Sequence, residues 1–388
     1  MTLPDLDEKA EVHSIEQEFA EWGGWHGDNV PVSAARCPDW VDPRRHSPDF
    51  LHLGVRGSAR EALALYDKGK KQQWDATVRI DWSLELDPEN PQEIDDRLIP
   101  IFGSSVWNRL TKEEKVRVRH HQQAQSLSQF MHGEQGALMA AARVVQTVPD
   151  LDAKFYAATQ VMDEARHVEA YARLLNEKLG IAYPITPGLK ALLETVLTDR
   201  RWDMTYLGMQ ILIVGLALAA FQRIRDYARN RLAASVNAYV MQDEARHVAF
   251  GRLALRDYYP QLSEAERGER EEFVIEACYH MRDRFNQREL WERLGLPADE
   301  CVEVTMASEN MRMFRKRLFS RIVPTVKDIG LWGARVRGAF ADMGALDLAD
   351  VDTDTLLEQD NKVAQEFDAG QFVRLTPEAS LGETPKNP

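Results

Sequence analysis

The chain has 388 residues, of which 44% are hydrophobic and 28% charged, and it is long enough to bury a large core. Its net charge of -14 argues against general nucleic-acid binding, which needs a basic surface. The three cysteines, Cys37, Cys278 and Cys301, include no Cys-x-x-Cys pair, which excludes a disulfide scaffold and a cysteine-ligated zinc or iron–sulfur site.

Residues 1–28 are acidic and lack the basic and apolar regions of a signal peptide. The longest apolar run, residues 211–221, is too short to span a bilayer and is typical of a buried core helix. We therefore expect a cytoplasmic protein that binds neither nucleic acid nor a membrane.

Residues 1–110 predict an N-terminal arm that is partly irregular. The first half is rich in Pro, Gly and Asp, and Trp22, Trp25 and Trp40 are expected to pack it on the core. A helix is predicted over residues 59–73. Residues 75–95 mix weak alternation with turn residues and predict an extended or loop segment.

Four long helices are predicted over residues 111–260. The capping box Thr111-x-x-Glu114 starts the first, which runs to about residue 146 before Val148-Pro149-Asp150 breaks it. The second covers about 151–178 and stops at Gly180. Thr186-Pro187 opens the third, which we expect to continue unbroken past residue 220. A turn follows within 221–231, and the fourth helix ends before Pro260.

Residues 261–388 predict further helices and a tail packed on this bundle. Ser263-x-x-Glu266 is a second capping box, beginning a helix to about residue 294. Another helix is predicted over 298–322, and the tail from about residue 369 is expected to fray. The chain is thus predicted to be all-α, a four-helix bundle with extra N- and C-terminal helices.

The pentapeptide Asp-Glu-Ala-Arg-His occurs twice, at residues 163–167 and 243–247. Each copy contains Glu-x-x-His, and on a helix positions i and i+3 share a face. Glu164 with His167, and Glu244 with His247, can therefore each point at a common object. Because the repeat is two helices long, each copy lies on the second helix of a hairpin, which is the arrangement of a bundle that holds a metal pair.

Such a site needs two more carboxylates, one from each remaining helix. Glu134 is the only acid between Glu114 and Asp150, and a hairpin turn centred near residue 149 makes it level with Glu164. On the third helix, a turn near residue 223 makes Asp203 level with Glu244. Glu194 and Gln210 remain alternatives there.

The rest of the repeat suits the surroundings of such a site. Asp163 and Asp243 are expected to accept the second N–H of the histidine in the opposite repeat. Arg166 and Arg246 then either pair with these aspartates or lie on a solvated face. Oxygen and nitrogen donors favour iron or manganese. The remaining predicted residues line a substrate pocket on helix one: Phe130, Gly133, Ala137 and Ala141.

Over about 130 residues the sequence resembles the ferritin-like di-iron carboxylate superfamily in its oxygen-activating branch. The branch includes bacterial multicomponent monooxygenase alpha subunits, the ribonucleotide reductase small subunit and arylamine N-oxygenases. Gly133-Glu134, followed 30 residues later by Asp163-Glu164-x-Arg166-His167, is similar to the first half of their site. Trp202-Asp203 with Met209-Gln210 resembles the third-helix element, although the family usually has Glu where this chain has Asp203.

Two positions distinguish the members of this branch. Leu207 stands where monooxygenases usually have Thr, and Tyr171 stands where the reductase subunit has its radical tyrosine. A redox role for Tyr171 is therefore an alternative to plain packing.

The resemblance implies an O2-dependent di-iron monooxygenase, with Fe/Fe or Mn/Fe, that hydroxylates or N-oxygenates a small organic substrate. It also implies an external electron donor, a ferredoxin or flavin reductase, and we expect a homodimer. The alternative is a radical-generating or ligand-binding oxidase similar to the reductase small subunit. Iron storage and a metal-free interaction protein are weaker rivals. The sequence leaves the substrate open, and it does not decide between C-hydroxylation, N-oxygenation and desaturation.

Overall fold

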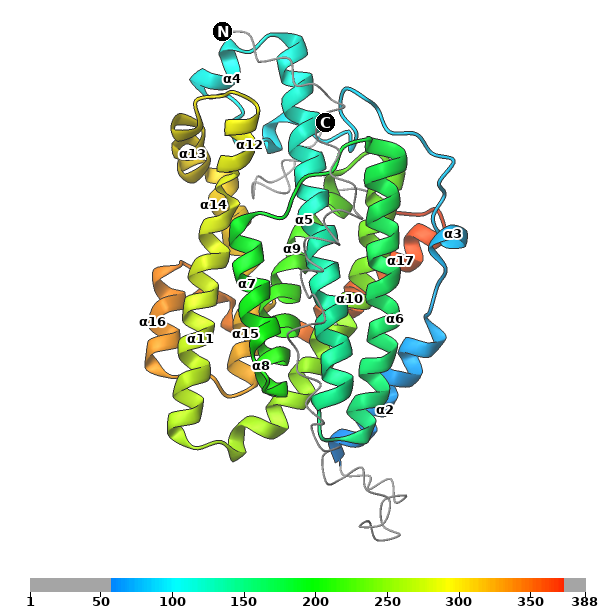
Figure 1. Ribbon diagram of the computed structural model, residues 1–388, viewed down its shortest axis with the longest axis vertical. Coiled ribbons are helices and arrows are strands. Elements are labelled where there is room, and N and C mark those ends of the chain that lie inside the picture. Colours follow the sequence, from blue (N-terminus) through cyan, green and yellow to red (C-terminus); the bar gives the residue numbers. More distant parts are fainter. Residues whose placement is uncertain (1–56, 373–388) are drawn as a thin grey trace, which may run out of the picture.

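The computed structural model describes residues 57–372, and every regular element within that range is helical (Figure 1). Trp22, Trp25 and Trp40, with most of the expected tail, lie outside the described residues. The described part of the arm begins with α2 (Gly57–Lys71), which is followed by the short helices α3 (Ala76–Arg79), η3 (Asp96–Leu98) and α4 (Ser105–Arg109). Helix α2 packs against two helices of the central bundle, α6 and α10.

The bundle consists of two hairpins of long helices. The first pairs α5 (Lys112–Thr147) with α6 (Leu151–Arg173), and a π-helical turn, η4 (Leu174–Leu179), extends α6 to the left-handed Gly180. The second pairs a composite helix with α10 (Arg231–Tyr258). Both hydrogen bonds of the predicted capping box at Thr111 are present, so local sequence fixes where α5 begins.

The third bundle helix differs from its prediction. The chain forms a separate α7 (Pro187–Thr198), which packs outside α5, and breaks at residues 199–201. The Asp199 carboxylate accepts the backbone N–H of Arg201 at 2.8 Å and pairs with its guanidinium, a local turn that competes with helix. The bundle helix then runs through α8 (Trp202–Thr205), the π-helix η5 (Tyr206–Ile213) and α9 (Val214–Tyr227).

Both predicted C-terminal helices are also interrupted. Helix α11 (Glu264–Asp283) gives way to η7 (Arg284–Asn286), and the left-handed Gln287 separates this from α12 (Arg288–Arg293). The segment expected as one helix over 298–322 forms α13 (Ala298–Ala307) and α14 (Glu309–Leu318), because Ser308 caps the start of α14. The remaining elements are α15 (Ile322–Asp328), α16 (Ala334–Asp342), η8 (Leu346–Asp350) and α17 (Thr353–Asp368).

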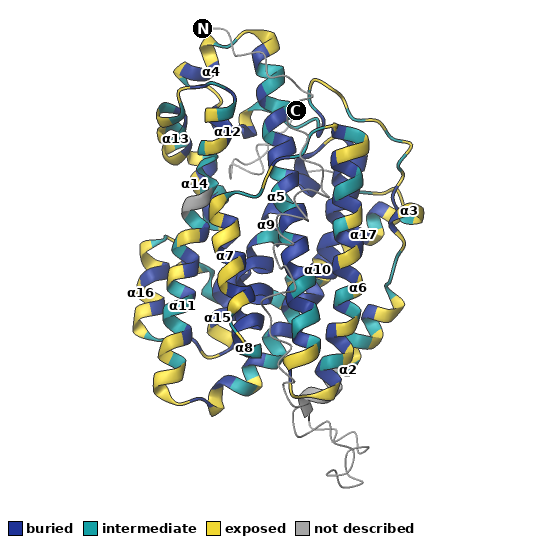
Figure 2. Cartoon of the chain, in the orientation of Figure 1, coloured by how far each residue is buried: buried dark blue, intermediate teal, exposed yellow. Residues whose placement is uncertain are grey.

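Burial is concentrated on the second hairpin, and α10 is dark almost throughout in Figure 2. The segment Trp202–Tyr227 is long and apolar enough to cross a membrane by composition, but 94% of its most apolar window is buried inside the protein. That burial is the behaviour of a central core helix, surrounded here by α10, α14 and α11.

Candidate metal centre

Four side chains from three helices converge in the middle of the bundle. Glu134 comes from α5, Glu164 and His167 from α6, and Glu244 from α10, and a ligand atom from each lies within 4.8 Å of the others. All are buried, with Glu134 exposed by 4% and Glu244 by 1%. The hairpin between α5 and α6 turns at residues 148–150, so Glu134 and Glu164 are equidistant from the turn and lie at one level.

The imidazole of His167 faces three carboxylates at once. Its Nδ1 lies 2.9 Å from Glu244 Oε1, 3.3 Å from Glu134 Oε2 and 3.4 Å from Glu164 Oε2. One N–H cannot satisfy three oxygens, whereas a cation at their centre can bind all four atoms. Oxygens Glu164 Oε2 and Glu244 Oε1 moreover accept no hydrogen bond within the described chain, although they are buried.

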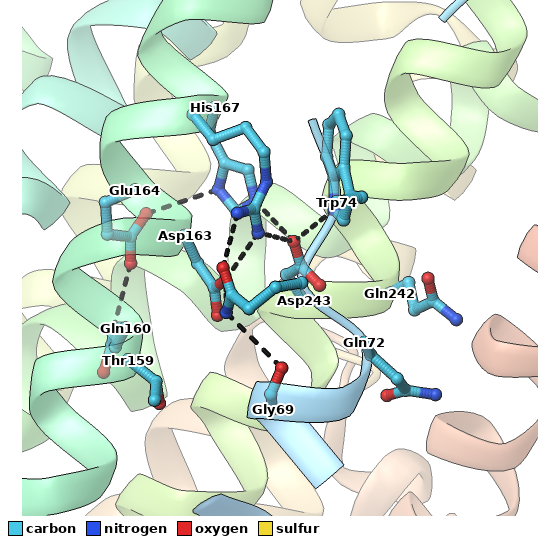
Figure 3. Close-up of polar contacts among 12 residues, drawn as sticks. Gly69, Gln72, Trp74, Thr159, Gln160, Asp163, Glu164, His167, Gln242 and Asp243 are labelled. Carbon is cyan, nitrogen blue, oxygen red and sulfur yellow. Dashed lines mark hydrogen bonds and ion pairs between the residues drawn. The ribbon is translucent and has the colours of Figure 1, made fainter. Parts of the chain in front are cut away.

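His247 repeats this geometry on the other side of the cluster. Its Nδ1 lies 3.1 Å from Glu244 Oε2 and 3.2 Å from Glu164 Oε1. The two motif glutamates therefore each contact both histidines. This is the symmetry that the 80-residue repeat produces when its two helices lie side by side. Gln160, one turn before Glu164, donates to Glu164 Oε1 at 2.9 Å (Figure 3).

The repeat aspartates lie behind the histidines, in a crossed arrangement. Asp243 Oδ2 is 3.1 Å from His167 Nε2, and Asp163 Oδ2 is 3.2 Å from His247 Nε2. A carboxylate only accepts, so Nε2 of each imidazole carries a proton, which leaves Nδ1 as the atom whose lone pair a bound metal would take. Arg166 bridges the two aspartates, with its Nη2 2.9 Å from Asp243 Oδ2.

The segment after α2 covers this layer, which sequence reasoning missed. Trp74 Nε1 donates to Asp243 Oδ2 at 2.8 Å (Figure 3). Gln73 Nε2 donates to Asp163 Oδ1 at 2.7 Å. Gln72 accepts from Arg246, which also pairs with Asp243. The contacts of Gln72, Gln73 and Trp74 join residues 90 to 174 positions apart, and no local pattern signals them.

The charges of the cluster perturb its own titration. Burial, and then repulsion from Glu244, raises the pKa of Glu134 well above its usual range. Burial alone would lower the pKa of His167, but the hydrogen bond to Asp243 and the close contacts with the three glutamates raise it well above its ordinary value. Without a metal, protonated imidazoles therefore balance the buried glutamates. A divalent cation can replace those protons, so the residues present fit a metal centre.

The third bundle helix contributes differently from the prediction. Asp203 is buried outside the cluster, where its Oδ2 accepts from Arg270 Nε at 3.0 Å. Glu194 is exposed on α7. Gln210, in η5, is fully buried, and neither its Oε1 nor its Nε2 has a hydrogen-bond partner among the described residues. A Cβ at Gly251, one turn beyond His247, would come within 2.8 Å of the Cβ of Gln210.

An apolar pocket reaches the cluster between α5 and the third bundle helix. Glu134 and Glu244 form part of its wall, with three of the four predicted pocket residues, Phe130, Gly133 and Ala137. A Cβ on Gly133 would meet no atom within 4 Å, so the space beside Glu134 is open. The fourth predicted residue, Ala141, is buried but does not line this pocket.

Tyr171 lies beside the pocket wall and not in the cluster. Its ring packs edge-on against Phe130 and tilted against Phe221, with centroids 5.9 Å apart in both pairs. Its hydroxyl donates to Asn237 Oδ1 at 3.0 Å. Burial, with the negative charges of Glu134 and Glu244, raises its pKa well above the ordinary value.

The family model of P-aminobenzoate N-oxygenase AurF matches residues 57–330, which is most of the chain and includes every residue of this cluster. The chain belongs to this family. The family is one of ferritin-like di-iron oxygenases, so the chain is an O2-dependent oxidoreductase that acts on a small organic substrate. No curated protein matches the chain.

Solved structures of R2-like ligand-binding oxidases are similar to the chain. A variant of this oxidase with an anaerobically reconstituted Mn/Fe cofactor is 17% identical, covers 74% of this chain and 97% of its own, and superposes with a TM-score of 0.44. The oxidase with an aerobically reconstituted metal cofactor after photoconversion is 15% identical, covers 81% of this chain and 94% of its own, and superposes with a TM-score of 0.38.

Proposed function

We propose that the chain binds two metal ions, Fe/Fe or Mn/Fe, through Glu134, Glu164, His167, Glu244 and His247, and uses them to oxidise an organic substrate with O2. The observation that carries this is the convergence of His167 Nδ1 on three buried carboxylates, two of whose oxygens have no hydrogen-bond partner. An all oxygen-and-nitrogen donor set suits iron or manganese.

Gln210 supports a revised sixth ligand. The turn between α9 and α10 centres on residue 229, so the residue level with Gln210 on α10 is 248, directly after His247. Asp203 is level with residue 255, roughly eleven residues and about 16 Å beyond Glu244. Asp203 also already has the Arg270 cation as its partner. We therefore propose the Gln210 amide oxygen as the third-helix ligand in place of Asp203.

When bound, the metals supply O2 activation with electrons from an external donor, a ferredoxin or flavin reductase. The chain's own residues do the rest. Asp163 and Asp243 hold each histidine in the tautomer that presents Nδ1. Arg166 and Arg246 offset the charge of these aspartates. Apolar helices exclude water, and the open space beside Gly133 admits the substrate.

We also propose a cellular location and an oligomeric state for the chain. A cytoplasmic location agrees with the reduced, buried Cys278 and Cys301. A homodimer is supported by an apolar stripe on α6, where Leu151, Phe155 and Met162 are exposed by 44%, 39% and 60%. Light scattering tests this proposal: we expect two chains per particle, with the stripe buried between them.

A radical role for Tyr171 remains the second candidate, because its ring is buried close enough to Glu134 and Glu244 for their charges to act on its pKa. A tyrosyl signal in electron paramagnetic resonance after O2 exposure, lost in Tyr171→Phe, would favour that function. Its absence, with substrate turnover intact, leaves Tyr171 as packing.

The central test is metal content in the full chain. We expect about two metal ions per chain by mass spectrometry, and a loss of most of this metal in Glu164→Ala. Glu169→Ala is the matched control, because Glu169 lies on the exposed face of α6 about one turn away. Metal-free wild type after iron loading, or a Glu164→Ala variant with unchanged content, would refute the proposal. Fragmentation of the products from an arylamine and an alkylbenzene, which locates the added oxygen, then separates N-oxygenation from C-hydroxylation.

A further inference from the structure

The pocket beside the cluster extends far beyond it. Its walls come from α5 between Gln122 and Ala137, and from the third bundle helix between Met209 and Ile224. Most of the lining is aliphatic or aromatic. Among the described residues that line the pocket, the one cation is Arg223 on α9. The pocket thus has the carboxylates of Glu134 and Glu244 at the cluster end and a guanidinium further along, and the exposed Glu289 of α12 also lines it.

The distance between the two ends follows from helix geometry. Residue 214 is level with Glu244 across the turn centred at 229, and Arg223 lies nine residues further along α9. At 1.5 Å per residue the two backbone positions are about 14 Å apart along the axis. A substituted benzoate is too short to touch both ends, whereas an acid with an alkyl or arylalkyl body can do so.

Arg223 has neutral partners only. Its Nη2 donates to the backbone oxygen of Leu98, its Nη1 lies 3.8 Å from the sulfur of Met311, and its guanidinium lies 4.9 Å from the ring centre of Phe314. No carboxylate of the described chain forms an ion pair with it. Burial, with the nearby charge of Arg317, lowers the pKa of Arg223 to about 10.

Arg223 is half-buried, and two fully buried arginines elsewhere in the protein have acidic partners. Arg225, two residues along the same helix, has Asp226 at 2.7 Å and Asp360 at 2.9 Å. Arg270 has Asp203 at 3.0 Å. Withdrawing a cation from water is costly unless an anion compensates it, and a protein of net charge -14 has many acids to place there. The missing counter-charge at Arg223 points to an anion that arrives with a ligand.

We propose that Arg223 binds the carboxylate of an elongated, otherwise apolar organic acid, whose far end reaches the metal centre. A guanidinium matches a carboxylate through two parallel N–H donors, and the apolar walls bury the body of the molecule. This names a substrate class for the proposed oxygenase and rests on that function. It makes Arg223 a specificity-determining residue and leaves the distal end of the substrate as the oxidised one.

Binding of dodecanoate to the full chain by calorimetry tests the proposal, below its micelle concentration and with dodecanol as the uncharged probe of equal length. Arg223→Gln should weaken dodecanoate binding roughly 10- to 100-fold, because a hydrogen bond to a charged group is lost. The same change should leave dodecanol binding unchanged, because dodecanol has no carboxylate. Arg223→Lys should retain most of the affinity. Arg229→Gln is the matched control, since Arg229 is exposed at the turn outside the pocket.

The inference is overturned if Arg223→Gln binds dodecanoate as wild type does, if dodecanol binding falls equally, or if Arg229→Gln has the same effect. Arg223→Met, which can keep the packing on Phe314, provides a second charge-free variant if the Gln variant does not fold. Binding is measured with and without iron. If binding depends on Arg223 but the acid is not oxidised, the oxygenase function alone is contradicted. If the acid is oxidised equally well without Arg223, this inference alone is contradicted.

Discussion

Replacement of Asp203 tests whether this carboxylate of the third bundle helix stabilises the fold or binds metal. Asp203 and Arg270 are exposed by 3% and 4% at the side chain and lie 3.0 Å apart. Removing one partner of a buried ion pair costs about 3–5 kcal/mol. Because Arg270 keeps Glu269 at 2.8 Å, and Asn still accepts a hydrogen bond, we expect Asp203→Asn to lower the free energy of unfolding by about 3 kcal/mol.

The assay combines urea denaturation with metal analysis of the same protein. Asp203→Asn should keep its metal, whereas Gln210→Ala should lose metal at a smaller cost in stability. Glu269→Gln is the control for an exposed partner of the same arginine, with a side chain exposed by 52%, and should cost less than about 1 kcal/mol. An Asp203→Asn protein that is stable but has lost half of its metal would refute the reasoning and restore Asp203 as a ligand.

Three further predictions use other parts of the structure. Asp243→Asn should weaken metal binding about 10- to 100-fold, which a chelator competition measures, because His167 exchanges a negatively charged acceptor for a neutral one. Burial lowers the pKa of His121 to about 4, so the folded protein holds the neutral imidazole and its stability falls as the pH drops below about 6.5. In urea unfolding, wild type should lose about 2 kcal/mol more of its free energy of unfolding between pH 7 and pH 5 than His121→Gln does. Gly133→Ala should stabilise α5 by up to about 1 kcal/mol, whereas Gly136→Ala, whose Cβ would come within 2.6 Å of Leu193, should cost about 1–3 kcal/mol; equal thermal midpoints would contradict this.

The sequence predicted the first hairpin well because its turn is well marked. Pro149 and Asp150 leave little freedom in where α5 and α6 meet, so counting outward from the turn places Glu134 beside Glu164. The second hairpin has no such marker. The expected turn near residue 223 lies instead at 228–230. Because level residues are counted outward from the turn, an error in the position of the turn shifts the predicted partner by twice as many residues. About five residues of error therefore moved the partner of Glu244 from residue 214 to Asp203.

Other features were beyond local pattern altogether. The break at Asp199 depends on a side chain that competes with helix for backbone N–H groups, in a stretch without Gly or Pro. The cover over Asp163 and Asp243 comes from Gln73 and Trp74, which follow α2 and lie far from the bundle in sequence. Such contacts are decided by how α2 packs on α6 and α10, and hydrophobic periodicity does not specify that packing.

The irregular third bundle helix explains why the candidate ligand on it was hard to predict. A π-helical stretch such as η5 rotates the side chains after it relative to a regular helix, and such stretches often occur at functional sites. Gly251 lets η5 approach α10 so closely that the Cβ of Gln210 nearly fills the glycine's missing side chain. With Gln210 as the proposed third-helix ligand, the centre would have three glutamates and one neutral amide. This neutral donor would make the site less negative, which would lower the cost of burying it before metal binds and would weaken its hold on the metals afterwards.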